Sequence, residues 1–147
     1  MSEQDSAVHE RDPSPLADAL AQVGDRWTLL VVQALLPGPR RFNDLLEEIP
    51  GIAANILSQR LKRLERDALL VSRPYTDRPP RAAYELTAEG RELAGALRLL
   101  AHWGARHALP ADAPRHSACG TPLEARWYCP TCDHLVEDEP ELEMHLL

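Results

Sequence analysis

The chain has 147 residues, enough for one compact domain or for a domain of about 100 residues with a small appendage, and too few for a large enzyme core. Hydrophobic residues make up 44% of the sequence and charged residues 27%, as in an average soluble protein, and no apolar run approaches the roughly 18 residues of a membrane span. Residues 1–12 lack the basic start and the apolar stretch of a signal peptide. We therefore expect a soluble, cytoplasmic protein without a membrane partner.

Apolar side chains at helical spacing predict four helices in the first 66 residues. Gly24 separates the first helix from the second, which Asp25 can cap. A third apolar stripe occupies residues 42–49, and the Pro-Gly turn at 50–51 leads into a fourth helix at about 52–66. The helices alternate with short turns, as expected for a small α-rich domain.

A predicted β-hairpin and a last helix follow the fourth helix. Two short strands flank a proline-stiffened loop at residues 76–80, and Thr87 can cap a helix that runs to about His107. Two helices joined by a tight turn, the second followed by a basic hairpin, are typical of a winged helix-turn-helix. The predicted fold class is mainly α with a small β-hairpin wing at about 74–82.

The charge distribution favours a nucleic-acid partner for this domain. Although the whole chain carries a net charge of −7, residues 40–81 hold nine Lys and Arg against six Asp and Glu, whereas residues 133–147 hold six acids and no Lys or Arg. Asn and Gln can make paired hydrogen bonds to adenine in a major groove, Lys and Arg can bind guanine or phosphate, and a stiff loop carrying arginine can enter a minor groove. The predicted DNA contacts are Asn55, Ser58, Gln59, Lys62, Arg63 and Arg66 on the fourth helix, and Arg78 and Arg81 on the wing. The alternatives are an ordinary amphipathic surface helix and a hairpin with solvated arginines.

Several separate segments resemble the HxlR family. They are residues 23–30 (VGDRWTLL), 38–42 (GPRRF), 49–52 (IPGI), 55–61 (NILSQRL), 78–81 (RPPR) and 84–87 (YELT), together with Gly90. The resemblance covers roughly residues 15–104. It implies a bacterial, dimeric, MarR-like winged-helix transcriptional regulator that binds operator DNA, with dimer contacts from its first and last helices.

The sequence departs from the pattern of that family at two positions. Many members carry Ser or Thr directly after the Gly-Ile of the turn, where Ala53 and Ala54 stand here, so the fourth helix should lack one capping oxygen. Some members carry a redox-active cysteine just ahead of the first helix, where this chain has Ser14. We therefore expect no thiol sensing at that position.

A cluster of potential metal ligands lies near the C-terminus. His116 and Cys119, and then Cys129 and Cys132, form two pairs, each spaced by two residues, which is zinc-knuckle spacing. Three thiolates and one imidazole would complete a tetrahedral, structural site, with residues 124–128 as a connecting strand. His134 is the alternative fourth ligand. An ordinary tail with three free cysteines, or a redox pair of Cys129 and Cys132, remains an alternative to a zinc-ribbon-like module with one zinc ion per chain.

These observations predict five regions, which are a flexible tail (1–14), a winged helix-turn-helix domain for DNA binding and dimerisation (15–108), a linker (109–115), the zinc-ribbon-like module (116–136) and an acidic tail (137–147). Extra apolar stripes on the first and last helices favour a homodimer. The principal hypothesis is a sequence-specific transcriptional regulator on double-stranded operator DNA, with a small-molecule effector of unidentified chemistry, and not an enzyme. The alternatives are a protein-interaction module, which the polar fourth helix disfavours, and a thiol or zinc redox sensor.

Overall fold

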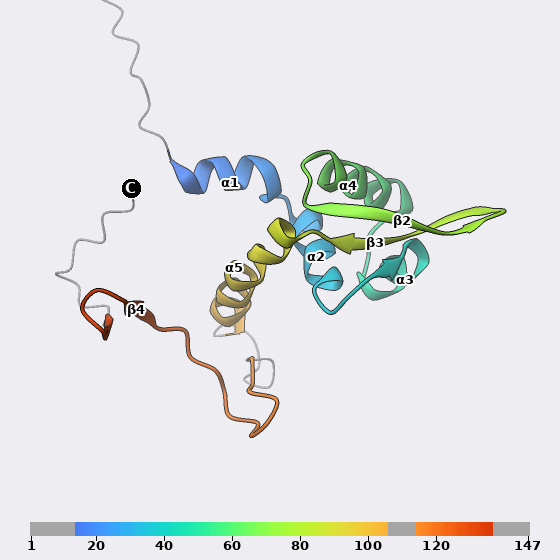
Figure 1. Cartoon of the computed structure of the whole chain (residues 1–147). Coiled ribbons are helices and arrows are strands. Elements are labelled where there is room, and N and C mark those ends of the chain that lie inside the picture. Colours follow the sequence, from blue (N-terminus) through green and yellow to red (C-terminus); the bar gives the residue numbers. More distant parts are fainter. Residues whose placement is uncertain (1–13, 106–113, 137–147) are drawn as a thin grey trace, which may run out of the picture.

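The computed structural model describes residues 14–105 and 114–136 (Figure 1). Most of the predicted N-terminal tail, the end of the last helix near His107, most of the linker at 109–115 and the acidic tail at 137–147 lie outside the described residues. Within the described residues, no helix combines the length and the apolar character needed to cross a membrane.

The winged domain contains five helices and a three-stranded sheet, in the predicted order apart from one additional short strand. The helices are α1 (Pro15–Val23), α2 (Arg26–Leu35), α3 (Phe42–Glu48), α4 (Ala54–Arg66) and α5 (Ala88–Ala105), and the strands are β1 (Arg40–Arg41), β2 (Leu70–Asp77) and β3 (Pro80–Leu86). The sheet is antiparallel with the order β1-β3-β2. Helices α3 and α4 form the predicted helix-turn-helix, and β2 and β3 form the wing.

The helix boundaries follow from local capping. Asp25 Oδ1 accepts hydrogen bonds from the backbone N–H groups of Trp27 and Thr28, both at 3.1 Å, which confirms Asp25 as the cap of α2. Thr87 Oγ1 likewise accepts from the N–H of Gly90 at 3.1 Å at the start of α5. Ala53 stands at the N-cap of α4 without a side-chain hydrogen bond, as predicted.

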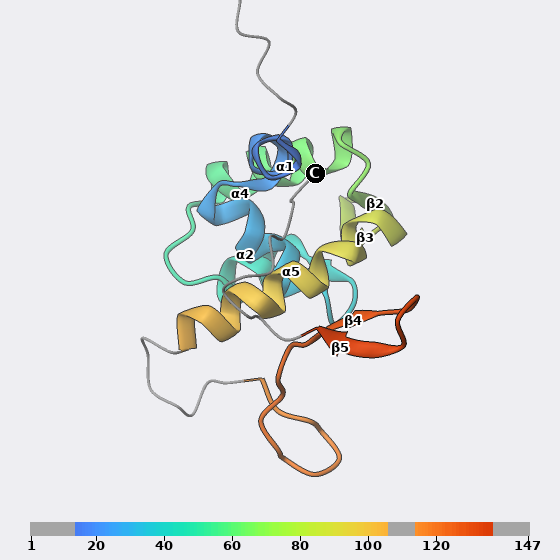
Figure 2. The same cartoon turned by 90° about the vertical axis from the view of Figure 1, so that its left-hand side faces the viewer.

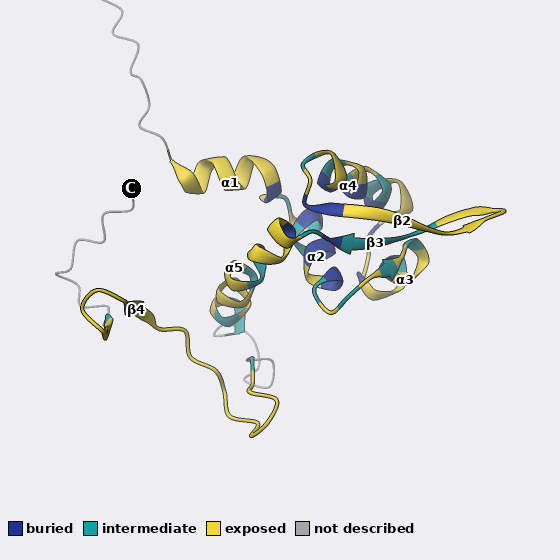
Figure 3. Ribbon diagram, viewed as in Figure 1, coloured by how far each residue is buried: buried dark blue, intermediate teal, exposed yellow. Residues whose placement is uncertain are grey.

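The hydrophobic core lies between α2, α3, α4 and the base of the wing, as the dark blue segments of Figure 3 show. Its largest fully buried apolar side chains are Val31, Val32, Leu35, Leu45, Leu57, Leu64 and Leu70. Helix α1 contributes only Val23, and α5 contributes Leu93 and Leu97 as partly buried side chains. The ends of α1 and α5 therefore project from the core, away from the wing (Figure 1).

The wing is longer and its tip shorter than the sequence predicted. Pairing continues from Leu70 opposite Leu86 to Asp77 opposite Pro80, so only Arg78 and Pro79 form the tip, and not the whole of residues 76–80. Pro80 lacks a backbone donor, but it is the first residue of its strand, where a proline is tolerated. The predicted strand at 124–128 is also displaced, because pairing begins only at Trp127 in β4 (Trp127–Cys129), which is antiparallel to β5 (His134–Val136).

Asp25 also connects α2 to α4, and we expect this contact to make stability depend on pH. Arg60 Nε donates to Asp25 Oδ1 at 2.8 Å, and the buried Thr28 hydroxyl donates to Asp25 Oδ2. Partial burial by itself would raise the pKa of Asp25, but the hydrogen bonds from Thr28 and the ion pair with Arg60 lower that pKa overall. The lowered pKa stabilises the fold above the unfolded value of about 3.9, and this stabilisation is lost as the pH falls through the lower, folded value.

Asp25→Asn should therefore lower the free energy of unfolding by about 1 to 2 kcal/mol at pH 7, because the variant keeps a capping oxygen and loses the charge that pairs with Arg60. Urea unfolding at several pH values measures the difference, which should shrink below about pH 4. Asp18→Asn on the exposed face of α1 is the matched control. If the difference in the free energy of unfolding between the wild type and Asp25→Asn stays constant between pH 7 and pH 3, the assigned role of Asp25 is contradicted.

Candidate nucleic-acid interface

Helix α4 separates an apolar face from a polar face, as the sequence predicted. Leu57, Leu61 and Leu64 are buried, with at most 2% of each residue exposed. The opposite face exposes Asn55, Gln59, Lys62 and Arg66. These four side chains combine two amides with two cations on one helical surface, which is the chemistry that reads base edges and binds phosphates in a major groove.

Two of the predicted contacts on α4 are less accessible. Ser58 is half-buried. Arg63 is also half-buried, its Nη2 donates to the backbone carbonyl of Ala21 in α1, and its Nε lies 3.9 Å from the carboxylate of Asp67. The guanidinium of Arg63 is therefore engaged within the protein, where it holds α1 against α4. Arg66 also pairs with Asp67, at 3.2 Å, but 72% of its side chain remains exposed.

The wing carries its two predicted arginines at and beside the tip. Arg78 occupies the tip, and Arg81 lies opposite Thr76 at the start of β3; both are exposed. The wing extends from the same side of the core as α3 and α4, and away from α1 and α5 (Figure 1). The exposed face of α4 and the tip of the wing can therefore contact separate parts of one DNA duplex.

Several contacts that the sequence did not reveal fix the wing relative to the helices. Glu65 Oε1 of α4 accepts hydrogen bonds from the backbone N–H of Ser72 at 3.3 Å and from its hydroxyl at 2.6 Å. Arg41, in the short strand β1, places its guanidinium 4.7 Å from the centre of the Tyr75 ring. The Arg-Arg pair at 40–41 was visible as local basic charge, but a two-residue strand has no periodicity from which these contacts could be predicted.

The structure brings each predicted pair of metal ligands together in a turn of the same kind. His116 Nδ1 lies 3.2 Å from Cys119 Sγ, and the N–H of Gly120 donates to the carbonyl of His116 at 2.7 Å. In the second turn the N–H of Asp133 donates to the carbonyl of Cys129 at 2.9 Å. Gly120 and Asp133, each directly after the second ligand, both adopt a positive φ, of 71° and 55°. The two turns thus share one backbone geometry.

The two pairs do not meet in the structure. Within residues 14–105 and 114–136, no group of three or more His, Cys, Asp or Glu side chains is close enough to hold one metal ion. Hydrogen bonds with the Thr121 side chain and backbone, and with His116, lower the pKa of Cys119 to about 7. Hydrogen bonds from the backbone and side chain of Cys132 lower the pKa of Cys129. His134 Nδ1 lies 3.3 Å from the carbonyl of Cys132, and His134 forms no three-residue metal-binding group with His116 and Cys119.

Comparison with known proteins gives one consistent result. The HxlR-like helix-turn-helix family matches residues 22–112. An uncharacterized HTH-type transcriptional regulator of Mycobacterium tuberculosis is 35% identical over 128 residues, which cover 84% of this chain and 80% of the relative. A match that covers 84% of 147 residues necessarily reaches into the C-terminal segment that carries Cys119.

Two solved structures of relatives resemble the winged domain. The HTH-type transcriptional regulator YtcD has a TM-score of 0.60 at 34% identity and covers 65% of this chain and 97% of its own. The reduced form of the regulator YodB from Bacillus subtilis has a TM-score of 0.56 at 28% identity, over 69% of this chain and 100% of its own.

Proposed function

Because the chain belongs to the HxlR-like helix-turn-helix family, we propose that it regulates transcription by binding a specific operator through α4 and the wing. Its relatives are transcriptional regulators, so the chain is a regulator and not an enzyme. The observation that carries the proposed mode of binding is the exposed face of α4. This face presents two amides and two cations (Asn55, Gln59, Lys62 and Arg66) and no large apolar side chain. A protein-docking helix would be expected to expose aromatic or apolar residues there.

Sequencing of genomic DNA fragments retained by the purified protein tests this proposal. We expect enrichment of a discrete sequence, including DNA upstream of the genes that it regulates, and a fall in affinity as salt rises, because phosphate contacts release counterions. Uniform retention of all fragments, or no retention at 50 mM salt, would contradict sequence-specific binding.

We also propose that the regulator acts as a homodimer. Helices α1 and α5 lie on the same side of the molecule (Figure 2), and both carry large apolar side chains that are more than half exposed. Leu16 and Leu20 on α1 are 68% and 54% exposed, and Leu100 and Trp103 on α5 are 53% and 57% exposed. A second copy would remove these side chains from water and place two copies of α4 for two half-sites.

Sedimentation should give twice the 16.4 kDa of one chain at micromolar concentration. We expect the double substitution Leu16→Glu and Leu20→Glu to weaken the dimer at least a hundredfold, because it places charge in an apolar interface. Gln22→Glu adds a charge to the same helix and is the control. A wild-type monomer, with and without operator DNA, would contradict the proposal.

We propose, in addition, that His116, Cys119, Cys129 and Cys132 hold one structural zinc ion. The first support is the backbone geometry that the two turns share. The second is the distance of 3.2 Å between His116 Nδ1 and Cys119 Sγ, which is close to the distance of about 3.5 Å expected between a nitrogen and a sulfur atom that bind the same tetrahedral zinc ion. When bound, the ion would cross-link the two turns. Joining the pairs requires the segment between Gly120 and Trp127 to bend.

Elemental analysis of protein purified without added metal should find about one zinc ion per chain. His116→Ala should reduce the content below about half an equivalent, whereas His134→Ala should leave it unchanged, because His116 completes the pair with Cys119. DNA affinity should survive metal removal, since the core lies wholly within the winged domain. Less than half an equivalent in the wild type would refute the site, and a large change in DNA affinity on thiol oxidation would favour the redox-sensor alternative.

A further inference from the structure

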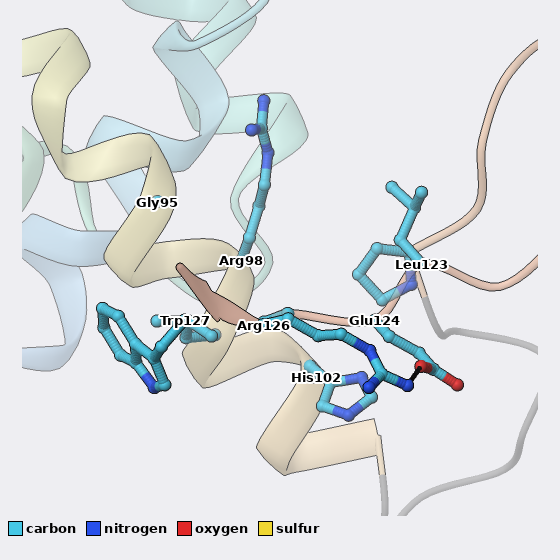
Figure 4. A pocket seen from close by; sticks show the side chains of 10 residues that line it. Gly95, Arg98, His102, Leu123, Glu124, Arg126 and Trp127 are labelled. Atoms are coloured by element: carbon cyan, nitrogen blue, oxygen red, sulfur yellow. Dashed lines mark hydrogen bonds and ion pairs between the residues drawn. The ribbon is translucent and has the colours of Figure 1, made fainter. Parts of the chain in front are cut away.

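A pocket of about 430 Å³ lies between α5 and the C-terminal segment (Figure 4). We call it the α5 pocket. Its volume falls within the range of about 300–1,000 Å³ that is usual for small-molecule sites. Helix α5 contributes Gly95, Arg98, Leu99 and His102, and the C-terminal segment contributes Pro114 and the run from Leu123 to Trp127.

The walls of the α5 pocket are apolar and incompletely covered. Leu99, Leu123 and Trp127 line it and are 41%, 44% and 57% exposed. The apolar surfaces of these three side chains are in contact with water, which is unfavourable in free energy. An apolar ligand in the pocket would remove this surface from water. The indole of Trp127 offers a flat surface against which a planar ring can stack.

The pocket occupies a face of α5 that neither the core nor the proposed dimer contact uses. Its four α5 residues follow at i, i+3, i+4 and i+7 from Gly95, which places them on one side of the helix. Leu93 and Leu97, which pack on the core, lie on the opposite side, and Leu100 and Trp103 lie between the two. A ligand in the pocket would therefore be compatible with a folded dimer.

The charge at the pocket edge is positive. Arg98 forms no hydrogen bond or ion pair with the residues that the structure describes. Arg126 Nη2 pairs with Glu124 Oε2 at 2.7 Å, so the lining's one carboxylate is already neutralised by a second arginine, and His102 adds a further nitrogen donor. A guanidinium without a carboxylate partner is a strong donor to an anion, in particular to the two oxygens of a carboxylate.

We propose that the α5 pocket binds a small, planar, apolar carboxylate, with the ring against Trp127 and Leu123 and the carboxylate on Arg98. Binding would join the last helix of the winged domain to the C-terminal segment through one ligand. The proposal does not rest on DNA binding, because the pocket lies on α5 and the C-terminal segment, apart from α4 and the wing.

Zinc binding would bend the segment between Gly120 and Trp127, which forms one wall of the pocket, so the test uses the full chain without metal or DNA. Calorimetric titration of this protein with 2-naphthoate and with the neutral 2-naphthamide tests the proposal. We expect the carboxylate to bind at least tenfold more tightly than the amide. Arg98→Met should weaken naphthoate binding at least tenfold and leave amide binding unchanged, and Trp127→Ala should weaken both. Arg91→Met is the matched control on the same helix, because Arg91 pairs with Glu85 at 3.5 Å and does not line the pocket.

The proposal would be overturned if the carboxylate and the amide bind with equal affinity, or if neither compound gives a heat of binding. It would also be overturned if Arg98→Met and Arg91→Met lose the same amount of affinity for naphthoate. If naphthoate does not bind and Arg98→Met instead changes the sedimenting mass, the pocket is part of a contact between two copies of the chain, which also overturns it. Thermal unfolding of each variant establishes that a loss of binding is not a loss of fold.

Discussion

Replacing both Asn55 and Gln59 with alanine should weaken operator binding by about 2 to 6 kcal/mol and leave binding to unrelated DNA almost unchanged. Each side chain is exposed on the polar face of α4, and a lost base contact costs about 1 to 3 kcal/mol. Because 1.4 kcal/mol is a factor of ten in the dissociation constant, the loss of specificity should exceed tenfold. Fluorescence anisotropy with operator and with scrambled DNA measures both affinities.

A matched pair of single variants separates reading of bases from binding of phosphate. Arg78→Ala at the wing tip should weaken binding to both DNAs and lower the slope of log affinity against log salt by about 1. Gln33→Ala, on an exposed position of α2, should change neither quantity. If the Asn55 and Gln59 variant weakens both DNAs equally, α4 binds phosphates and does not read sequence.

Gly90→Ala should destabilise the winged domain by at least about 2 to 3 kcal/mol. A Cβ atom at this position would overlap the backbone carbonyl oxygen of Leu69 and lie 3.2 Å from Leu86 Cδ2. The carbonyl of Leu69 cannot move freely, since it also accepts a hydrogen bond from the N–H of Thr87 at 3.0 Å. The added methyl group must therefore push the start of α5 away from the base of the wing.

Gly95→Ala on the same helix provides the control for Gly90→Ala. No heavy atom lies within 4 Å of the added Cβ at Gly95, so the higher helix propensity of alanine should stabilise the chain by up to about 1 kcal/mol. Urea unfolding measures both free energies. Equal effects of the two substitutions would show that α5 does not pack closely on Leu69.

Periodicity and capping chemistry were sufficient to predict most of the winged domain. The apolar line of Leu57, Leu61 and Leu64 identified the buried face of α4, and Asp25 and Thr87 marked two helix starts, because these signals are local. The amides of Asn55 and Gln59 were placed on the exposed face for the same reason.

Contacts between residues that are far apart in the sequence could not be predicted from the sequence alone. Arg63 satisfies the same helical pattern as Lys62, yet it reaches the carbonyl of Ala21, a residue 42 positions away. A long, flexible side chain can extend into solvent or donate a hydrogen bond to a distant acceptor. For Arg63, the packing of α1 on α4 determines which of these two conformations forms. The α5 pocket could not be predicted for a similar reason, since its two walls come from separate segments of the chain.

Hydroxyl-radical footprinting on the enriched operator tests most directly the claim that α4 and the wing together bind DNA. Wild-type protein should protect two half-sites and the minor-groove segment that flanks each of them, and Arg78→Ala should lose only the flanking protection. The variant with alanine at both Asn55 and Gln59 should lose protection of the operator altogether under conditions where the wild type saturates it. Identical footprints from the wild type and from both variants would contradict the account.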